Sequence, residues 1–178
     1  MTKSSNLFPD VRMHSVRTRV ALPADFASIQ SLVFGSHTEA LSKSGKDVTS
    51  LLPVIFPTLT CLEEFMRPTS HYWIAEEAGA NEIIGAISII RSAEDPRTVD
   101  LNAFYVREKC QRSGVGAQLM GCALEFCRAS DICRVELISN RGCYDPAIAY
   151  YQRIGFQLLR EYEVSPGIVL VDMALELK

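Results

Sequence analysis

Two glycines, Gly114 and Gly116, stand one residue apart in the segment CQRSGVGAQLMG, where a strand-like run gives way to a helix-like run. Glycine at the start of a helix costs conformational entropy, so its presence indicates that another group approaches the backbone closely. The first amides of a helix have no partners within the helix, and that end carries a partial positive charge. The segment is therefore typical of a loop that binds an anion on main-chain N–H groups.

Two common phosphate-binding loops do not match this segment. A Walker loop requires Gly-Lys followed by Ser or Thr, but Ala117 and Gln118 follow Gly116. A dinucleotide-binding fingerprint requires a third glycine, and Leu119 occupies that position. A nucleotide-binding domain of either kind is therefore disfavoured.

The pattern that does fit is Gln/Arg-x-x-Gly-x-Gly/Ala, which resembles the acyl-CoA loop of the GNAT superfamily of N-acyltransferases. The run FYVREKCQRSGVGAQLM resembles the strand, loop and helix of that family in one piece. Further along, ELISN followed by DPAIAYYQRIGF resembles the family's next strand and the helix that ends in Tyr-x-x-x-Gly-Phe. Two motifs in the family's order extend the resemblance from about residue 16 to the C-terminus.

This resemblance implies acetyl-CoA as a co-substrate, without a metal. Its pyrophosphate would lie on the amides of the glycine loop, with the charge of Arg112 beside it. Its pantetheine arm would pair with the backbone of the strand before the loop, and an asparagine after the next strand would hydrogen-bond it. The implied cofactor-binding residues are Phe104, Tyr105, Val106, Gln111, Arg112, Ser113, Gly114, Val115, Gly116, Ala117, Asn140 and Tyr151.

Direct attack of an amine on a thioester needs a base and an acid. A lysine-like amine has a pKa near 10.4 and must lose a proton first. By resemblance Asp100 is the base, directly or through water, because some family members carry a glutamate there. Tyr151, four residues before Gly155, has the spacing of the family's thiol-facing tyrosine and would protonate the leaving thiolate. Tyr150 is its rival, since one helical step of about 100° lets only one of them face the sulfur.

The leading hypothesis is an N-acetyltransferase that moves an acetyl group from acetyl-CoA to a primary amine of a small molecule or peptide. The alternative is a non-catalytic acyl-CoA-binding sensor or regulatory module. Such a module would also need the two glycines, but it would need neither Tyr151 nor a base. Cys110, beside the start of the helix, leaves a covalent acyl-enzyme route open.

The acceptor is expected to contact residues 36–67 and 161–167, the regions that usually select it in this family. The first region contains His37, Glu39, Asp47, Glu63 and Glu64, which could attract a cationic amine. These residues do not distinguish a polyamine, an aminoglycoside, an amino acid or a protein terminus.

Composition narrows the class of partner. The 178-residue chain is 48% hydrophobic, which suits one domain with a sizeable core, and its net charge of −3 argues against nucleic acid. Its six cysteines and three histidines show no metal-ligand spacing and are interpreted as buried residues in a reducing compartment. No secretory leader or 18-residue apolar run is found, so we expect a cytoplasmic protein without a membrane partner. The family resemblance is compatible with a homodimer.

Periodicity predicts a mixed α/β sheet in a single GNAT-like domain over residues 15–178, after a flexible tail over residues 1–14. About six to seven strands and about four flanking helices are expected. A first helix begins after Pro23 and ends at Gly35, and a short one is closed by Pro68. The strand 98–106 alternates, so Asp100, Asn102 and Phe104 are predicted to share a face. Further strands are predicted over residues 16–21, 71–77, 82–90, 135–139, 157–164 and 168–177, and further helices over 114–129 and from an Asp145 N-cap to Gly155.

Overall fold

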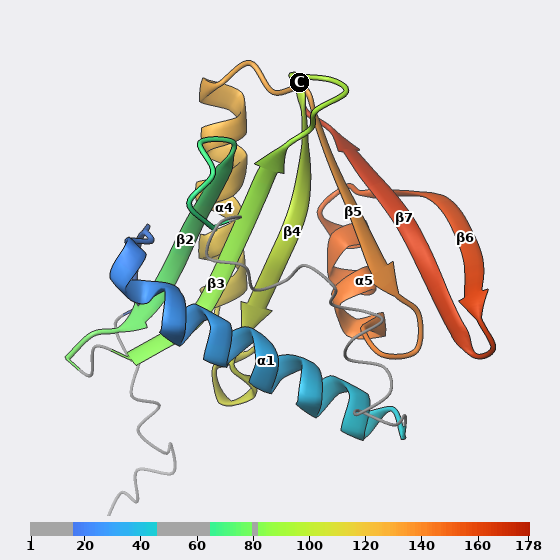
Figure 1. Ribbon diagram of the computed structural model, residues 1–178, viewed down its shortest axis with the longest axis horizontal. Helices are drawn as coiled ribbons and strands as arrows, with labels where there is room; N and C mark the ends of the chain where they lie inside the picture. Colours follow the sequence, from blue (N-terminus) through green and yellow to red (C-terminus); the bar gives the residue numbers. More distant parts are fainter. Residues whose placement is uncertain (1–15, 46–64, 80–81) are drawn as a thin grey trace, which may run out of the picture.

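The computed structural model describes residues 16–45, 65–79 and 82–178. They form one seven-stranded mixed sheet with the order β1-β2-β3-β4-β5-β7-β6 (Figure 1). Its strands are β1 (Val16–Val20), β2 (Ser70–Glu77), β3 (Glu82–Arg91), β4 (Thr98–Val106), β5 (Arg134–Asn140), β6 (Gln157–Ser165) and β7 (Ile168–Glu176). The α-helices of the described residues are α1 (Phe26–Lys43), α4 (Val115–Ala129) and α5 (Asp145–Arg153), and short 3-10 turns are η1 (Pro23–Asp25) and η2 (Glu108–Cys110).

This architecture confirms the predicted α/β fold and strand number. Three α-helices lie in the described residues, against about four predicted for the whole chain. Most of the helix predicted before Pro68, and the tail predicted over residues 1–14, lie outside the described residues.

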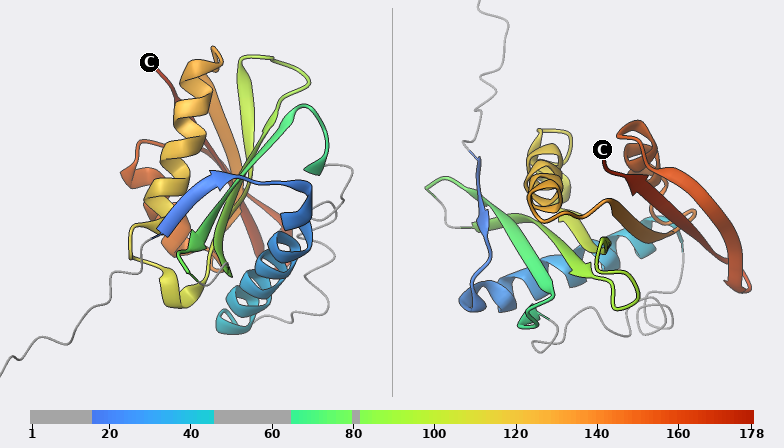
Figure 2. Two further views of the ribbon diagram at one scale, coloured as in Figure 1. Left: turned by 90° about the vertical axis from the view of Figure 1, so that its left-hand side faces the viewer. Right: turned by 90° about the horizontal axis from the view of Figure 1, so that it is seen from above.

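Helices cover the two faces of the sheet unequally (Figure 2). On one face α4 and α5 pack over the larger core cluster, to which α4 contributes Val115, Leu119 and Ala123. On the opposite face α1 packs Ile29 and Leu32 into a smaller cluster. On this second face α1 contacts β3 and β4, so the part of the face formed by β6 and β7 is left more open. β6 is exposed along most of its length.

The first helix is longer than the sequence indicated, so the predicted end at Gly35 is wrong. α1 runs on to Lys43, and His37 and Leu41 continue the buried stripe of Val33 at a spacing of four residues. A glycine inside a helix costs roughly 1 kcal/mol. The burial of Leu41, which has no exposed surface, outweighs that cost.

A β-bulge in β4 changes which side chains face the site. Ile89 of β3 pairs with Leu101, while the preceding Ser88 pairs with Ala103, so Asn102 is an extra residue in β4. A bulge reverses the alternation of the residues that follow it. The prediction that Phe104 shares a face with Asp100 and Asn102 is therefore wrong.

After the bulge, Phe104 packs with the larger core cluster on the α4–α5 side. Tyr105 instead packs against the smaller cluster beneath α1. The bulge thus decides that Phe104 faces the α4–α5 side and Tyr105 the α1 side, immediately before the glycine loop.

Candidate functional site: the gap between two parallel strands

β4 and β5 are parallel neighbours that soon separate. Their ladder comprises three residue pairs, from Thr98–Arg134 to Asp100–Glu136. Beyond these pairs β4 continues to pair with β3, and β5 with β7. The two strands therefore diverge towards their carboxyl ends, as Figure 1 shows.

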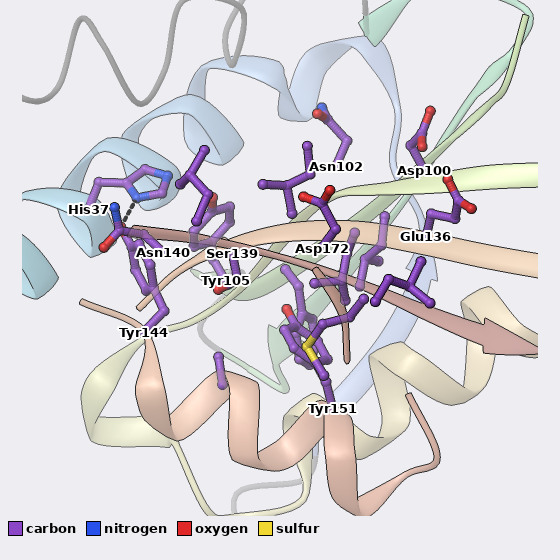
Figure 3. A pocket seen from close by; sticks show the side chains of 18 of the residues that line it. His37, Asp100, Asn102, Tyr105, Glu136, Ser139, Asn140, Tyr144, Tyr151 and Asp172 are labelled. Atoms are coloured by element: carbon purple, nitrogen blue, oxygen red, sulfur yellow. Dashed lines mark hydrogen bonds between the residues drawn. The ribbon is translucent and has the colours of Figure 1, made fainter. Parts of the chain in front are cut away.

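A cavity of about 420 Å³ occupies this divergence. Its polar lining comes from α1, α5, the turn before α5 and the strands β4, β5 and β7, and Figure 3 shows these side chains converging on one space. Asp100 and Glu136 lie at one end, and His37, Asn140 and Tyr144 lie at the other. Of the residues assigned to the site from sequence, the cavity is lined by Asp100, Phe104, Tyr105, Asn140 and Tyr151.

The glycine loop lies outside this cavity and forms the entrance to α4. Gly114 is the N-cap residue with φ of 91°, in the left-handed region, and no side chain caps the helix. The side chains of Gln111 and Ser113 donate hydrogen bonds within the loop, to the carbonyl oxygens of Val106 (3.0 Å) and Cys110 (2.6 Å). The first amides of α4 have no carbonyl acceptor within the helix, and such amides can bind an anion.

Gly116 has a packing reason as well as a binding one. A Cβ added there would lie 3.2 Å from Cζ of Phe104, closer than side chains normally approach. The absence of a side chain at Gly116 therefore lets α4 sit against β4. Gly114 has no such neighbour and is required instead by its backbone conformation.

Tyr151 reaches the cavity from α5, through the gap that the diverging strands leave. It is buried, and burial raises the pKa of its phenol above the ordinary value of 10. Its hydroxyl therefore stays protonated at neutral pH and can donate a proton. Its rival Tyr150 does not line the cavity and lies under the guanidinium of Arg153, 5.3 Å from its ring.

Asp100 stands at the last rung of the β4–β5 ladder, directly opposite Glu136. Partial burial, followed by repulsion from Glu136 and Glu94, raises the pKa of the Asp100 carboxyl. Glu136 is paired with Arg134 at 2.6 Å, whereas the side chain of Asp100 has no hydrogen bond or ion pair within the described parts of the chain. Asp100 is thus the less satisfied carboxylate of the two.

The side-chain amide of Asn140 is suited to binding a ligand in the cavity. It is 2% exposed, and neither its side-chain oxygen nor its nitrogen has a hydrogen-bond partner among the described residues. A buried amide without partners costs on the order of 1–3 kcal/mol. A polar arm lying between β4 and β5 would supply the missing donor and acceptor.

His37 and Tyr144 were not assigned catalytic or cofactor-binding roles from the sequence. Nδ1 of His37 and the hydroxyl of Tyr144 share a short hydrogen bond, and the His37 ring packs edge-on against Tyr105 with centroids 4.6 Å apart. Tyr144 is the N-cap of α5, where the sequence had indicated Asp145. The pair therefore links α1 to the start of the helix that carries Tyr151. In the sequence, the helical spacing of Val33, His37 and Leu41 could have indicated that His37 is buried.

The described residues contain no cluster of three or more His, Cys, Asp or Glu side chains arranged to hold a metal ion. None of the helices in the described ranges has both the length and the hydropathy of a membrane span.

Comparison with known proteins places the chain in a family. The model of the acetyltransferase (GNAT) family matches residues 42–156, more than half of the sequence. The protein therefore belongs to the GNAT family of acetyltransferases. No match was found among curated proteins.

Solved structures share the fold at low identity. The PaiA N-acetyltransferase of Thermoplasma acidophilum, solved in complex with coenzyme A, has a TM-score of 0.69 at 15% identity and covers 89% of this chain and 98% of its own. A GNAT-family acetyltransferase of Staphylococcus aureus Mu50 has a TM-score of 0.68 at 14% identity, covering 92% and 100%. The ribosomal-protein-S18-alanine N-acetyltransferase of Escherichia coli has a TM-score of 0.64 at 13% identity, covering 91% and 94%.

The buried His37 makes stability depend on pH. Burial lowers the pKa of His37 from 6.5 to about 3, so the folded protein keeps it neutral while the unfolded chain binds a proton below about pH 6.5. The free energy of unfolding should therefore fall as pH drops from about 6.5 towards 3, by up to about 1.4 kcal/mol per pH unit from this group. Urea unfolding at pH 7.5, 6 and 5 measures this slope.

The variant His37→Gln should lower stability at pH 7.5 and flatten the slope. His71→Gln is the comparison, because His71 is less buried and its pKa is lowered less strongly. Equal slopes for the wild type and His37→Gln would show that His37 is not held neutral.

Proposed function

We propose that this GNAT protein transfers an acetyl group from acetyl-CoA to a primary amine by direct attack. The observation that carries the proposal is the composition of the cavity between β4 and β5. Among the described residues, it holds a carboxylate without a basic partner, a protonated phenol and an unsatisfied amide in one space. Base, acid and ligand-binding group are the parts that this reaction needs.

Two parts of the structure would bind two parts of acetyl-CoA, the pyrophosphate and the pantetheine arm. The main-chain amides of Gly114, Val115, Gly116 and Ala117, with Arg112 beside them, would hold the pyrophosphate. The unsatisfied amide of Asn140 and the β4 backbone from Phe104 to Val106 would hold the pantetheine arm. Acetyl-CoA would supply the activated acetyl group as a thioester.

The catalytic roles follow from position and protonation. Asp100, at the closed end of the gap, accepts a proton from the incoming ammonium and leaves a neutral nitrogen that can attack. Tyr151, facing the gap from α5, donates its proton to the departing sulfur. The acetyl group moves from sulfur to nitrogen, and the second proton of that nitrogen restores the Tyr151 hydroxyl. The proton on Asp100 passes to solvent, so the net products are the amide, free CoA and one proton.

The sensor alternative is disfavoured by this arrangement, because a module that only binds acyl-CoA has no use for Asp100 at the closed end of the cavity. The covalent alternative is disfavoured by location. Cys110 lies in η2, before the glycine loop, and does not line the cavity.

Acetyl-CoA should raise the melting temperature of the wild type, because a ligand selective for the folded state stabilises it by about 2.7 kcal/mol at a hundred times its Kd. Gly114→Ala should lose most of this shift, since alanine is strained at a φ of 91° and distorts the start of α4. Gly121→Ala is the matched control in the same helix, with no close neighbour, and should keep the shift. No shift of the wild type with either acetyl-CoA or CoA would contradict the proposal.

Tyr151→Phe should lower kcat for acetyl transfer by at least about a hundredfold, the usual effect of removing a general acid. The acetyl-CoA-induced rise in melting temperature should persist, because the ring still fills its place in the core. Release of free CoA thiol with an amine acceptor measures kcat. Tyr150→Phe, one residue away and outside the cavity, should stay within a few-fold of wild type, and an equal loss in both variants would refute the assignment.

Asp100 should set the acid limb of the pH profile. A base works only when deprotonated, so kcat/KM should fall as pH drops through the pKa of Asp100, which burial and then Glu136 raise from its ordinary value. Asp100→Asn should lower kcat/KM and remove this limb, measured by thiol release between pH 4.5 and 9. An unchanged limb in Asp100→Asn would assign the base to another group.

A further inference from the structure

We infer that the acceptor is a small amine with a single positive charge on an apolar body, such as an alkylamine or arylalkylamine, and not a polyamine. The inference rests on the proposed function and names the substrate class of the same cavity. Two independent features carry it: the charge that the cavity leaves unneutralised, and the apolar side chains that its lining exposes.

Three carboxylates line the cavity, but two of them already have cationic partners. Glu136 accepts a hydrogen bond from Arg134 at 2.6 Å. Asp172 accepts hydrogen bonds from Arg160 at 2.7 and 2.9 Å. Asp100 has no recorded cationic partner within residues 16–45, 65–79 and 82–178. Within the described residues, Asp100 is therefore the cavity carboxylate that can take one further positive charge.

The position of Asp100 strengthens this reading. Its direct opposition to Glu136 places two carboxylates on neighbouring strands, an arrangement that destabilises a sheet when both are charged. One ammonium at Asp100 relieves the repulsion. A second ammonium would have to compete with Arg134 or Arg160 for a carboxylate that is already paired.

One part of the cavity lining is made of apolar side chains that are exposed. Ile138 in β5 is 64% exposed, Leu159 in β6 is 53% exposed, and Val164 near the end of β6 is 48% exposed, and all three line the cavity. Large exposed aliphatic side chains gathered in one cavity mark a surface that binds an apolar group.

These side chains lie at a suitable distance from the charge. Ile138 follows Glu136 by two residues on the same face of β5, which is about 7 Å along a strand. Across the sheet Ile138 pairs with Asp172, and Asp172 pairs with Arg160, the residue after Leu159. An amine bound at Asp100 would therefore extend its carbon chain over Ile138 towards β6.

The polar groups beside this apolar surface are consistent with an apolar acceptor. Arg160 forms an ion pair with Asp172, the residue opposite Ile138 on β7, so this carboxylate already has a cationic partner. A polyhydroxylated or polycationic acceptor would cover Ile138 and Leu159 with groups that must lose water. Ile138 and Leu159 offer no side-chain hydrogen bonds that would compensate for this loss of hydration.

Matched amines test the inference. Butylamine and putrescine have the same carbon chain and differ by the second ammonium, and hexylamine and phenethylamine extend the apolar body. With saturating acetyl-CoA, thiol release should give a kcat/KM at least tenfold higher for butylamine than for putrescine, and higher still for hexylamine and phenethylamine. A kcat/KM for putrescine or spermidine equal to or above that of butylamine overturns the inference, as does a preference for a peptide amino terminus over all four.

Two neighbouring leucines of β6 supply a matched pair of variants. Leu159→Ser should raise KM for hexylamine several-fold with kcat nearly unchanged, and Leu158→Ser should not, because Leu158 is 43% exposed but does not line the cavity. Ile138→Asp should reverse the preference and favour putrescine. All three substituted side chains are exposed. A retained acetyl-CoA shift in melting temperature confirms that each variant is folded.

The outcomes separate this inference from the proposed function. Acetylation of polyamines alone leaves an N-acetyltransferase with a different acceptor class. An acetyl-CoA shift without thiol release for any amine contradicts the proposed function itself, and the acceptor class falls with it. Equal KM values in Leu158→Ser and Leu159→Ser would remove the apolar surface from acceptor binding.

Discussion

Parallel β-strands normally satisfy their main-chain N–H and C=O groups on one another, and β4 and β5 stop doing so after three residue pairs. The bulge at Asn102 follows the last pair by two residues and increases the local twist, which turns β4 away from β5. Everything proposed for the site depends on this break in the ladder. It provides a cavity inside the sheet, and it lets a side chain from the α5 side reach a space that also faces α1.

The elements around the gap hold it open and equip it. Phe104, turned towards the helices by the bulge, fills the space above Gly116 and lies 6.0 Å from Tyr151, centroid to centroid. On the other face His37 ties α1 to Tyr144 at the start of α5. Asn140 and Asp100 mark the two ends of the cavity, one with an unsatisfied amide and the other with a carboxylate opposite a like charge. These are energetic costs that the folded chain carries, and ligands would relieve both.

The sequence was sufficient for the fold and for much of the site. The bounds of β4 were predicted residue for residue, and Tyr151 and Asp100 do line one cavity, although their roles stay predictions. The face of Phe104 was mispredicted because alternation assumes a regular strand, and a bulge is set by pairing with β3. His37 was placed in a loop because Gly35 was read as a helix end, while tertiary burial of Leu41 carries the helix through. The pairing of Asp172 with Arg160 could not be foreseen, since it depends on the register between β6 and β7.

The central claim is that the diverging strands accommodate the arm of an acyl-CoA. A crystal structure of the protein grown with CoA measures this directly. The account predicts the arm between β4 and β5, with the amide of Asn140 within hydrogen-bond distance of it and the pyrophosphate on the amides of residues 114–117. CoA bound elsewhere on the sheet, or β4 and β5 paired along their full length in that crystal, would contradict it.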